Sequence, residues 1–331
     1  MFSPFRRFRP LSLAAATVLS FAGCTGDDSP LAPVDAGPVP PADLSQVEAV
    51  VSADAALITA QRIAFLSPRN GPLSVYKMDP AGFNVLRLTK TADPVYQPAW
   101  SYDNKRIAMV RERWDGTVSR TDIWLVNADG TNGHWLRNTM SPWHLQDPSW
   151  APDGTHLLVS MYFAPYWYLG KFDVASGNIT VLHPIGGGII GRAPSYDKAG
   201  KRIAYVGSGR LTVDQVNTDG SGHKVLFKSS GPPVDLPRFS PDGGRIVFVK
   251  GPLGGNTDVF VKNLGTGVVT KLTSSTAADG LATWSPDGAK LAFVSWRAGP
   301  GQIYTMSSST GGSLTRITHT SVSEGAPAWS H

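Results

Sequence analysis

The chain has 331 residues, of which 41% are hydrophobic, and it carries 30 Lys and Arg against 25 Asp and Glu. Its 35 Gly and 26 Pro favour many short strands joined by turns, and no sustained apolar period of 3.6 occurs beyond residue 60. An all-β fold is therefore expected. The first 23 residues hold three Arg and no acid, so the remainder has 27 basic against 25 acidic residues. With no basic stripe, nucleic acid is not expected as a partner.

Residues 1–23 have the pattern of an export signal that ends at the only cysteine. Arg6, Arg7 and Arg9 precede the uncharged run "LSLAAATVLSFA", which is short for a membrane span. The following "FAGC" is similar to a bacterial lipobox, so we expect lipidation at Cys24; ordinary cleavage that leaves a free thiol is the alternative. Thr25 then favours the outer membrane, with the protein facing the periplasm or the cell surface. Residues 24–60 are expected to be the lipidated cysteine and a Pro/Ala-rich tether.

A unit of about 45 residues recurs over the rest of the chain. After a first apolar strand at Ile63, the unit opens each time with an aromatic residue: Trp100, Trp150, Tyr196, Phe239, Trp284 and Trp329. Seven residues after each of the first five comes another apolar strand, and two further predicted strands complete the unit, such as "DVFVKN" and "VTKLT". Four short strands per unit, without helical crossovers, predict the blades of a β-propeller.

The phase of the repeat predicts how the ring closes. The chain opens with the second strand of a unit and ends with a first strand, "APAWS" at 326–330. This last strand is expected to pair beside "RIAFLS" at 62–67, which removes the open edges of the ring. The prediction is a six-bladed propeller over residues 61–331, with four-stranded blades and a monomeric state.

The turn after each aromatic residue has a simple structural interpretation. In "SPDG", Pro fixes φ, Asp bonds its own backbone and Gly supplies the positive φ that a tight hairpin needs. Asp103, Asp153, Asp242 and Asp287 are therefore interpreted as turn residues rather than ligands or catalysts. The aromatic residues are interpreted as packing between adjacent blades.

The segments "WSPDGAKLAFVS", "DIWLVNADGTN" and "LTRIT" resemble the TolB-like family of six-bladed propellers, and the resemblance extends over about residues 61–330. It implies the fold and an association with the cell envelope. TolB itself carries an additional N-terminal α/β domain, whereas a tether precedes the first strand here. The resemblance therefore implies a lipoprotein relative that lacks this domain.

The loops that emerge on one face of the predicted ring vary in length and chemistry. These are the connections between strands 2 and 3 of a blade and those between blades, and loops on a rigid scaffold commonly carry recognition. Arg, Trp and Tyr are typical of protein interfaces. The candidates for partner binding on this face are Arg111, Arg113, Trp114, Trp143, His144, Tyr162, Tyr166, Trp167, Arg192, Trp296 and Arg297. The alternative is that several of them pack blade against blade.

No catalytic motif is found, and no cofactor or metal is predicted. The favoured function is a non-enzymatic binding module, anchored through Cys24, for an envelope protein or a peptidoglycan-associated partner. Whether the protein is an enzyme stays open, because similar propellers occur in oligogalacturonate lyases. A lyase-like, carbohydrate-active site at the channel mouth would draw on His144, His183 and His319 with Asp147, Asp235 and Glu324. A small-ligand or peptide sensor is the third possibility.

Overall fold

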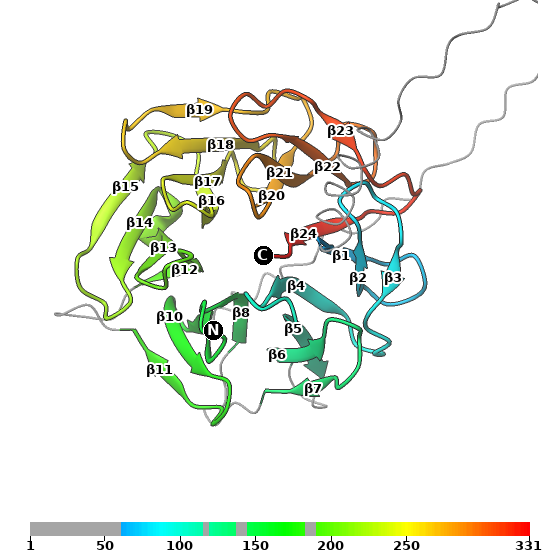
Figure 1. Ribbon diagram of the computed structural model, residues 1–331. Coiled ribbons are helices and arrows are strands. Elements are labelled where there is room, and N and C mark those ends of the chain that lie inside the picture. The colour runs from blue at the N-terminus through cyan, green and yellow to red at the C-terminus, as the bar shows by residue number, and fades with distance from the viewer. Residues whose placement is uncertain (1–60, 115–118, 137–143, 183–189) are drawn as a thin grey trace, which may run out of the picture. The chain divides into compact units, whose positions relative to one another are not determined.

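The computed structural model describes residues 61–331 except 115–118, 137–143 and 183–189. Within these ranges, six sheets of four antiparallel strands stand around a central axis (Figure 1). The single short helical turn of the described residues is η1 (Ser208–Arg210). No helix in the described ranges has the length and apolarity needed to cross a membrane. The predicted all-β, six-bladed propeller is confirmed.

The blades follow one another along the chain, and each runs from its innermost to its outermost strand. Blade 1 consists of β24 (Gly325–Trp329), β1 (Ile63–Ser67), β2 (Ser74–Met78) and β3 (Leu86–Arg87). Blade 2 consists of β4 (Val95–Trp100), β5 (Arg106–Trp114), β6 (Ser119–Asn127) and β7 (His134–Trp135). Blade 3 consists of β8 (His144–Trp150), β9 (His156–Phe163), β10 (Tyr166–Asp173) and β11 (Ile179–Val181).

The second half of the ring repeats this order. Blade 4 consists of β12 (Gly191–Tyr196), β13 (Arg202–Gly207), β14 (Thr212–Asn217) and β15 (Lys224–Lys228). Blade 5 consists of β16 (Val234–Phe239), β17 (Arg245–Lys250), β18 (Asp258–Asn263) and β19 (Val269–Lys271). Blade 6 consists of β20 (Asp279–Trp284), β21 (Lys290–Ser295), β22 (Gln302–Ser307) and β23 (Thr315–Arg316).

The ring is closed as the repeat predicts. The last strand β24 pairs antiparallel with the first strand β1, so the two ends of the propeller share one sheet (Figure 1). Ile63 is registered with Trp329 and Ala64 with Ala328. The indole of Trp329 also donates to Gln61 at 3.2 Å. Its ring is 5% exposed and packs in the core cluster of blades 1 and 6. Closure therefore combines a strand ladder with burial of a large apolar side chain.

The six aromatic residues of the repeat pack between adjacent blades, as expected. All six are at most 7% exposed: Trp100, Trp150, Tyr196, Phe239, Trp284 and Trp329. The indole of Trp284 donates to the carbonyl of Arg238 in the preceding blade at 3.0 Å. The guanidinium of Arg245 covers the same indole at 4.7 Å and donates to the carbonyl of Gly288 at 2.8 Å. The indoles of Trp100 and Trp150 donate to the preceding blade in the same way, so these three tryptophans join two blades through both polar and apolar contacts.

The carboxylates of the turn aspartates accept hydrogen bonds within their own turns. Asp242 accepts hydrogen bonds from the Ser240 hydroxyl and from the backbone N–H of Gly244. These hydrogen bonds stabilise the charged carboxylate and lower the pKa of Asp242. The same backbone contact is made in three other turns: by Asp103, Asp153 and Asp287. The structural interpretation of these residues is confirmed.

Every innermost strand contains a bulge that the sequence did not predict. Three residues before the aromatic position, a non-glycine residue takes a left-handed φ of 44° to 55°: Gln97, Asp147, Ala193, Leu236, Leu281 and Ala326. The strand register shifts at the same place in all six blades. Bulges bend a strand and redirect its side chains, and they are frequent beside functional sites. Here they encircle the axis of the propeller.

Candidate functional site

The antiparallel blades separate the loops into two sets. We use "variable face" for the end that carries the connections between strands 2 and 3 of a blade and those between blades. The "turn face" carries the connections between strands 1 and 2 and between strands 3 and 4. Eight sequence candidates belong to described parts of the variable face: Arg111, His144, Tyr162, Tyr166, Trp167, Arg192, Trp296 and Arg297. Trp143 lies outside the described residues, and Arg113 and Trp114 are described only as backbone of β5.

Four of these candidates come together where blade 3 meets blade 4. His144 is registered opposite Tyr162, which in turn is registered opposite Trp167. The rings of Tyr162 and Trp167 lie 5.1 Å apart, and the guanidinium of Arg192 reaches over Trp167 at 5.9 Å. Tyr166, in the same β9–β10 hairpin, is 47% exposed. The cluster thus joins an aromatic pair to a cation on the variable face.

Two candidate arginines are instead engaged in ion pairs within their blades. Arg111 binds Asp93 at 2.7 Å and lies over Trp124 at 4.4 Å. Arg297 binds Asp279 at 3.0 Å, and the side chain of Asp279 is completely buried. Because a buried carboxylate needs a partner, the role of Arg297 includes holding the start of β20.

The variable face also presents apolar side chains that sequence analysis missed. Phe163, Leu211 and Leu253 are 53%, 42% and 66% exposed, and they lie in strand 2–3 connections of blades 3, 4 and 5. Leu253 and Trp296 line a cavity of about 220 Å³ between blades 5 and 6. A large apolar residue inside a Gly- and Pro-rich loop, as in "GPLGG", was the available signal.

The carboxylates that a lyase-like cation site would need are engaged by donors of the chain itself. The carboxylate of Asp235 forms ion pairs with Arg192, at 3.2 Å, and with Arg210. The carboxylate of Glu324 forms an ion pair with Arg69 at 2.7 Å. Burial raises the pKa of Asp235, and the two arginines oppose that shift. In the part of the chain that the structure describes, no three His, Cys, Asp or Glu side chains gather as a metal site. His183, one residue of that hypothesis, lies outside the described residues.

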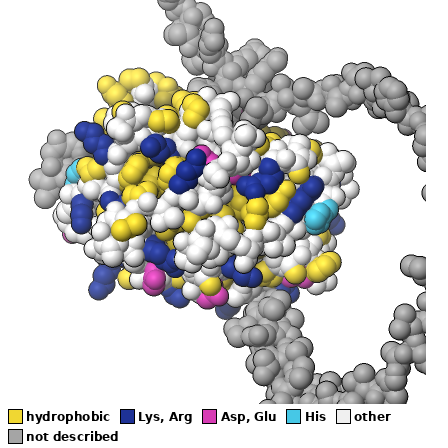
Figure 2. Space-filling view, turned by 90° about the horizontal axis from the view of Figure 1, so that it is seen from above, with side chains coloured by type: hydrophobic (Ala, Val, Ile, Leu, Met, Phe, Trp, Pro, Cys, Tyr) yellow, Lys and Arg dark blue, Asp and Glu magenta, His cyan; other side chains and the backbone are white. Residues whose placement is uncertain are grey.

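On the side of the ring seen in Figure 2, charged side chains are dispersed. Figure 2 views the molecule from above Figure 1 and shows lysine and arginine side chains scattered among hydrophobic ones, with a few acidic side chains between them. On the face shown, the basic groups do not form one continuous stripe of the kind that tracks a nucleic-acid backbone.

Part of the chain is similar to a known family of propeller domains. A family model described as the TolB beta propeller domain matches residues 173–331. A TolB homolog of Chlorobium luteolum is 31% identical over 121 residues, which are 36% of this chain and 27% of that protein. The match therefore spans only about a quarter of the curated relative.

Solved structures agree on the fold. TolB from Acinetobacter baumannii superposes with a TM-score of 0.69 at 22% identity, over 88% of this chain and 74% of that one. An oligogalacturonate lyase in complex with manganese reaches a TM-score of 0.54 at 18% identity, over 78% and 74% of the two chains. At these identities the two likenesses show the fold alone. Residues 173–331 are thus similar to the TolB beta propeller domain, and the described part of the chain has the six-bladed fold of TolB.

Proposed function

We propose that the protein is a non-enzymatic binding module of the bacterial cell envelope that docks a protein partner on its variable face. The observation that carries this proposal is that blades 3, 4 and 5 each expose large apolar side chains on the variable face: Phe163, Tyr166, Leu211 and Leu253. Fully burying one such side chain is worth about 1.5–3 kcal/mol, so together they offer the centre of an interface.

The surroundings of these side chains support a protein partner. The aromatic pair Tyr162–Trp167 and the cation of Arg192 lie on the same face and belong to residue types that dominate interface energetics. The loops stand on paired strands, so little ordering is needed on binding. The family resemblance adds the envelope as the setting and an envelope protein or peptidoglycan-associated protein as the partner.

Site-specific photo-crosslinking in cells tests the proposal. A photoreactive phenylalanine analogue would replace Tyr166 or Leu253 on the variable face. The matched control would replace Val268, which is 59% exposed but lies in a strand 3–4 connection on the turn face. We expect one discrete cross-linked protein from the first two positions and none from the control. Equal products from all three positions, or no product from any, would contradict the proposed interface.

We also propose that Cys24 carries a lipid that holds the module on the outer membrane. Its support is the sequence of residues 1–25 alone: a basic start, a twelve-residue apolar run, and the only cysteine after Ala22 and Gly23. Cys24→Ser is expected to move the protein from the membrane fraction to the soluble envelope fraction, and to abolish labelling by a radioactive fatty acid. Membrane association that persists without the cysteine would rule out this anchor.

A further inference from the structure

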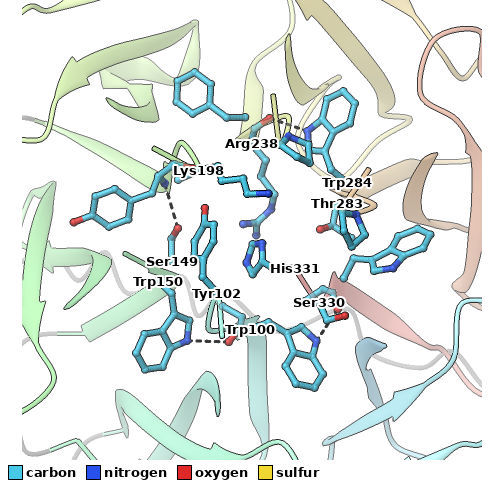
Figure 3. Close-up of a pocket in the computed structure, with 18 of the residues that line it drawn as sticks. Trp100, Tyr102, Ser149, Trp150, Lys198, Arg238, Thr283, Trp284, Ser330 and His331 are labelled. Atoms are coloured by element: carbon cyan, nitrogen blue, oxygen red, sulfur yellow. Dashed lines mark hydrogen bonds between the residues drawn. The ribbon is translucent and has the colours of Figure 1, made fainter. Parts of the chain in front are cut away.

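A pocket on the turn face, opposite the proposed docking surface, occupies the mouth of the central channel (Figure 3). It is formed by the ends of the innermost strands and by the turns that follow them, and its volume is about 100 Å³. In Figure 3 the side chains of Tyr102, Lys198, Arg238 and His331 point into its centre.

These four side chains are departures from the internal repeat. Two residues after the aromatic position, three blades have proline, whereas the other three have Tyr102, Lys198 and His331. One residue before the aromatic position, five blades have Ala, Ser or Thr, and blade 5 has Arg238. The repeat requires only a turn and a small residue at these two positions. The other blades fold without these four side chains, so the repeat does not require them, and all four line one cavity.

The charged side chains that line the pocket are positive. Lys198 and Arg238 bring two cations, and no Asp or Glu is among the residues that line it. The guanidinium of Arg238 has neither an ion pair nor a hydrogen-bond acceptor among the described residues, although other blade arginines such as Arg245 are fully engaged. Burial lowers the pKa of Arg238, and the more distant Asp147 only partly opposes this. Two neighbouring cations with no carboxylate side chain in the wall around them are stabilised by a bound anion.

The remaining groups at the mouth supply neutral donors. His331 stacks on Tyr102 with ring centroids 3.8 Å apart and is fixed by a hydrogen bond from its backbone N–H to Asn104 at 2.8 Å. Burial lowers the pKa of His331 to about 4, so its ring is a neutral donor or acceptor at pH 7. Thr283 and Ser149 add hydroxyl groups to the wall.

The tryptophan side chains at the mouth do not provide a stacking surface for a ligand. Trp100, Trp150 and Trp284 are only 4%, 1% and 6% exposed, because their faces are buried between blades. Recognition in this pocket thus depends on charge and hydrogen bonds rather than on contact with a flat ring. A planar guanidinium can donate two parallel hydrogen bonds to the oxygens of a phosphate or a carboxylate, and a neighbouring lysine adds a third charged donor.

We propose that the turn-face mouth of the channel is a binding site for the oxyanion group of a small molecule, held by Arg238 and Lys198 with Tyr102 as a neutral donor. The site is separate from the variable face. The bound oxyanion group can be a phosphate or a carboxylate, and two anionic probes distinguish these two chemistries.

The test is a titration of the full chain followed by NMR of the tryptophan indole N–H groups at constant ionic strength. Trp284 reports on the pocket, because its indole donates to the carbonyl of Arg238 at 3.0 Å, and Trp284→Phe identifies its resonance. Inorganic phosphate and benzoate are the two anionic probes, and benzamide is the uncharged match for benzoate. Lys224→Gln, on the exposed outer strand β15, is the control for loss of one positive charge.

We expect a saturable shift of the Trp284 indole signal with phosphate, which indicates a phosphate ligand, or with benzoate, which indicates a carboxylate. Benzamide should produce none. Arg238→Gln and Lys198→Gln should each weaken binding by about tenfold or more, as for loss of one charge-assisted hydrogen bond, and Lys224→Gln should not. If Arg238→Gln does not fold, Lys198→Gln decides the matter, because its side chain is exposed. A shift with neither anion, or equal binding by the Lys198 and Lys224 variants, would overturn the proposal.

Discussion

The substitution Gly82→Ala tests how closely adjacent blades nest. Gly82 lies in the turn between β2 and β3 with a φ of +91°. A Cβ atom added there would stand 2.1 Å from the carbonyl oxygen of Ile317 in blade 6, whereas real Cβ contacts essentially never fall below 3.0 Å. Because the obstacle is backbone, it can be relieved only if blade 1 moves away from blade 6, where β24 and β1 close the ring.

The expected loss of unfolding free energy has two parts that a matched variant separates. An L-residue held at positive φ costs about 1–2 kcal/mol, and overpacking adds about 1–3 kcal/mol. Gly71→Ala bears only the first cost, since Gly71 has a φ of +112° but no atom within 4 Å of an added Cβ. Gly82→Ala should therefore be less stable than Gly71→Ala by about 1–3 kcal/mol.

Chemical denaturation followed by tryptophan fluorescence measures this difference through the transition midpoint at constant slope. The comparison relies on the two variants rather than on the absolute stability of either. Equal midpoints for Gly71→Ala and Gly82→Ala would refute the reasoning, because steric contact between blades 1 and 6 would then contribute nothing measurable.

Three further predictions concern ring closure, blade packing and pH. Trp329→Ala should lower the free energy of unfolding by about 3–5 kcal/mol, whereas Phe83→Ala, at a 69% exposed site, should change it by less than about 0.5 kcal/mol in the same denaturation assay. Arg245→Lys keeps the charge but loses the fork that holds Gly288, so a loss of about 1–2 kcal/mol is expected by thermal unfolding. The pKa of His331 is about 4 when folded, against 6.5 ordinarily, so the unfolded chain binds the extra proton and stability falls as pH drops from 6.5 toward 4. Melting temperatures across this window should fall less steeply for His331→Gln, and equal slopes would contradict this assignment.

The scaffold could be predicted from the sequence because its determinants are local and repeated. Each unit carries an aromatic residue, a turn and strands at a fixed spacing, and the phase of Trp329 relative to Ile63 implies the shared first blade. The bulges were not predictable in this way. Ala193 and Leu236 have no local preference for a left-handed φ, so their conformation is imposed by strand pairing on either side.

The sequence predicts the two candidate sites to different extents. Diversity among loops pointed to the variable face, but only the structure shows that the side chain of Leu253 is 66% exposed there. The turn-face pocket is hidden in the sequence, because "SYDN" at 101–104 and "DKAG" at 197–200 satisfy the same turn chemistry as "SPDG". Alignment of the repeats by position, rather than by turn type, would have shown Tyr102 and Lys198 as equivalent departures.

Repeat position also decides which arginines are suitable for testing function. Arg297 is typical of interface residues by type, yet it neutralises Asp279, whose side chain is completely buried. Removing one partner of such a pair leaves an unpaired charge and costs about 3–5 kcal/mol, so Arg297→Ala would lose binding through loss of structure. Among the described residues the guanidinium of Arg238 has no ion pair and no hydrogen-bond acceptor, so its loss should leave the fold intact while changing ligand binding. A variant at each position, compared by melting temperature and by anion titration, should show this opposite pattern. If Arg238→Gln destabilises the fold as much as Arg297→Ala, then Arg238 is a scaffold residue and the repeat argument fails at this position.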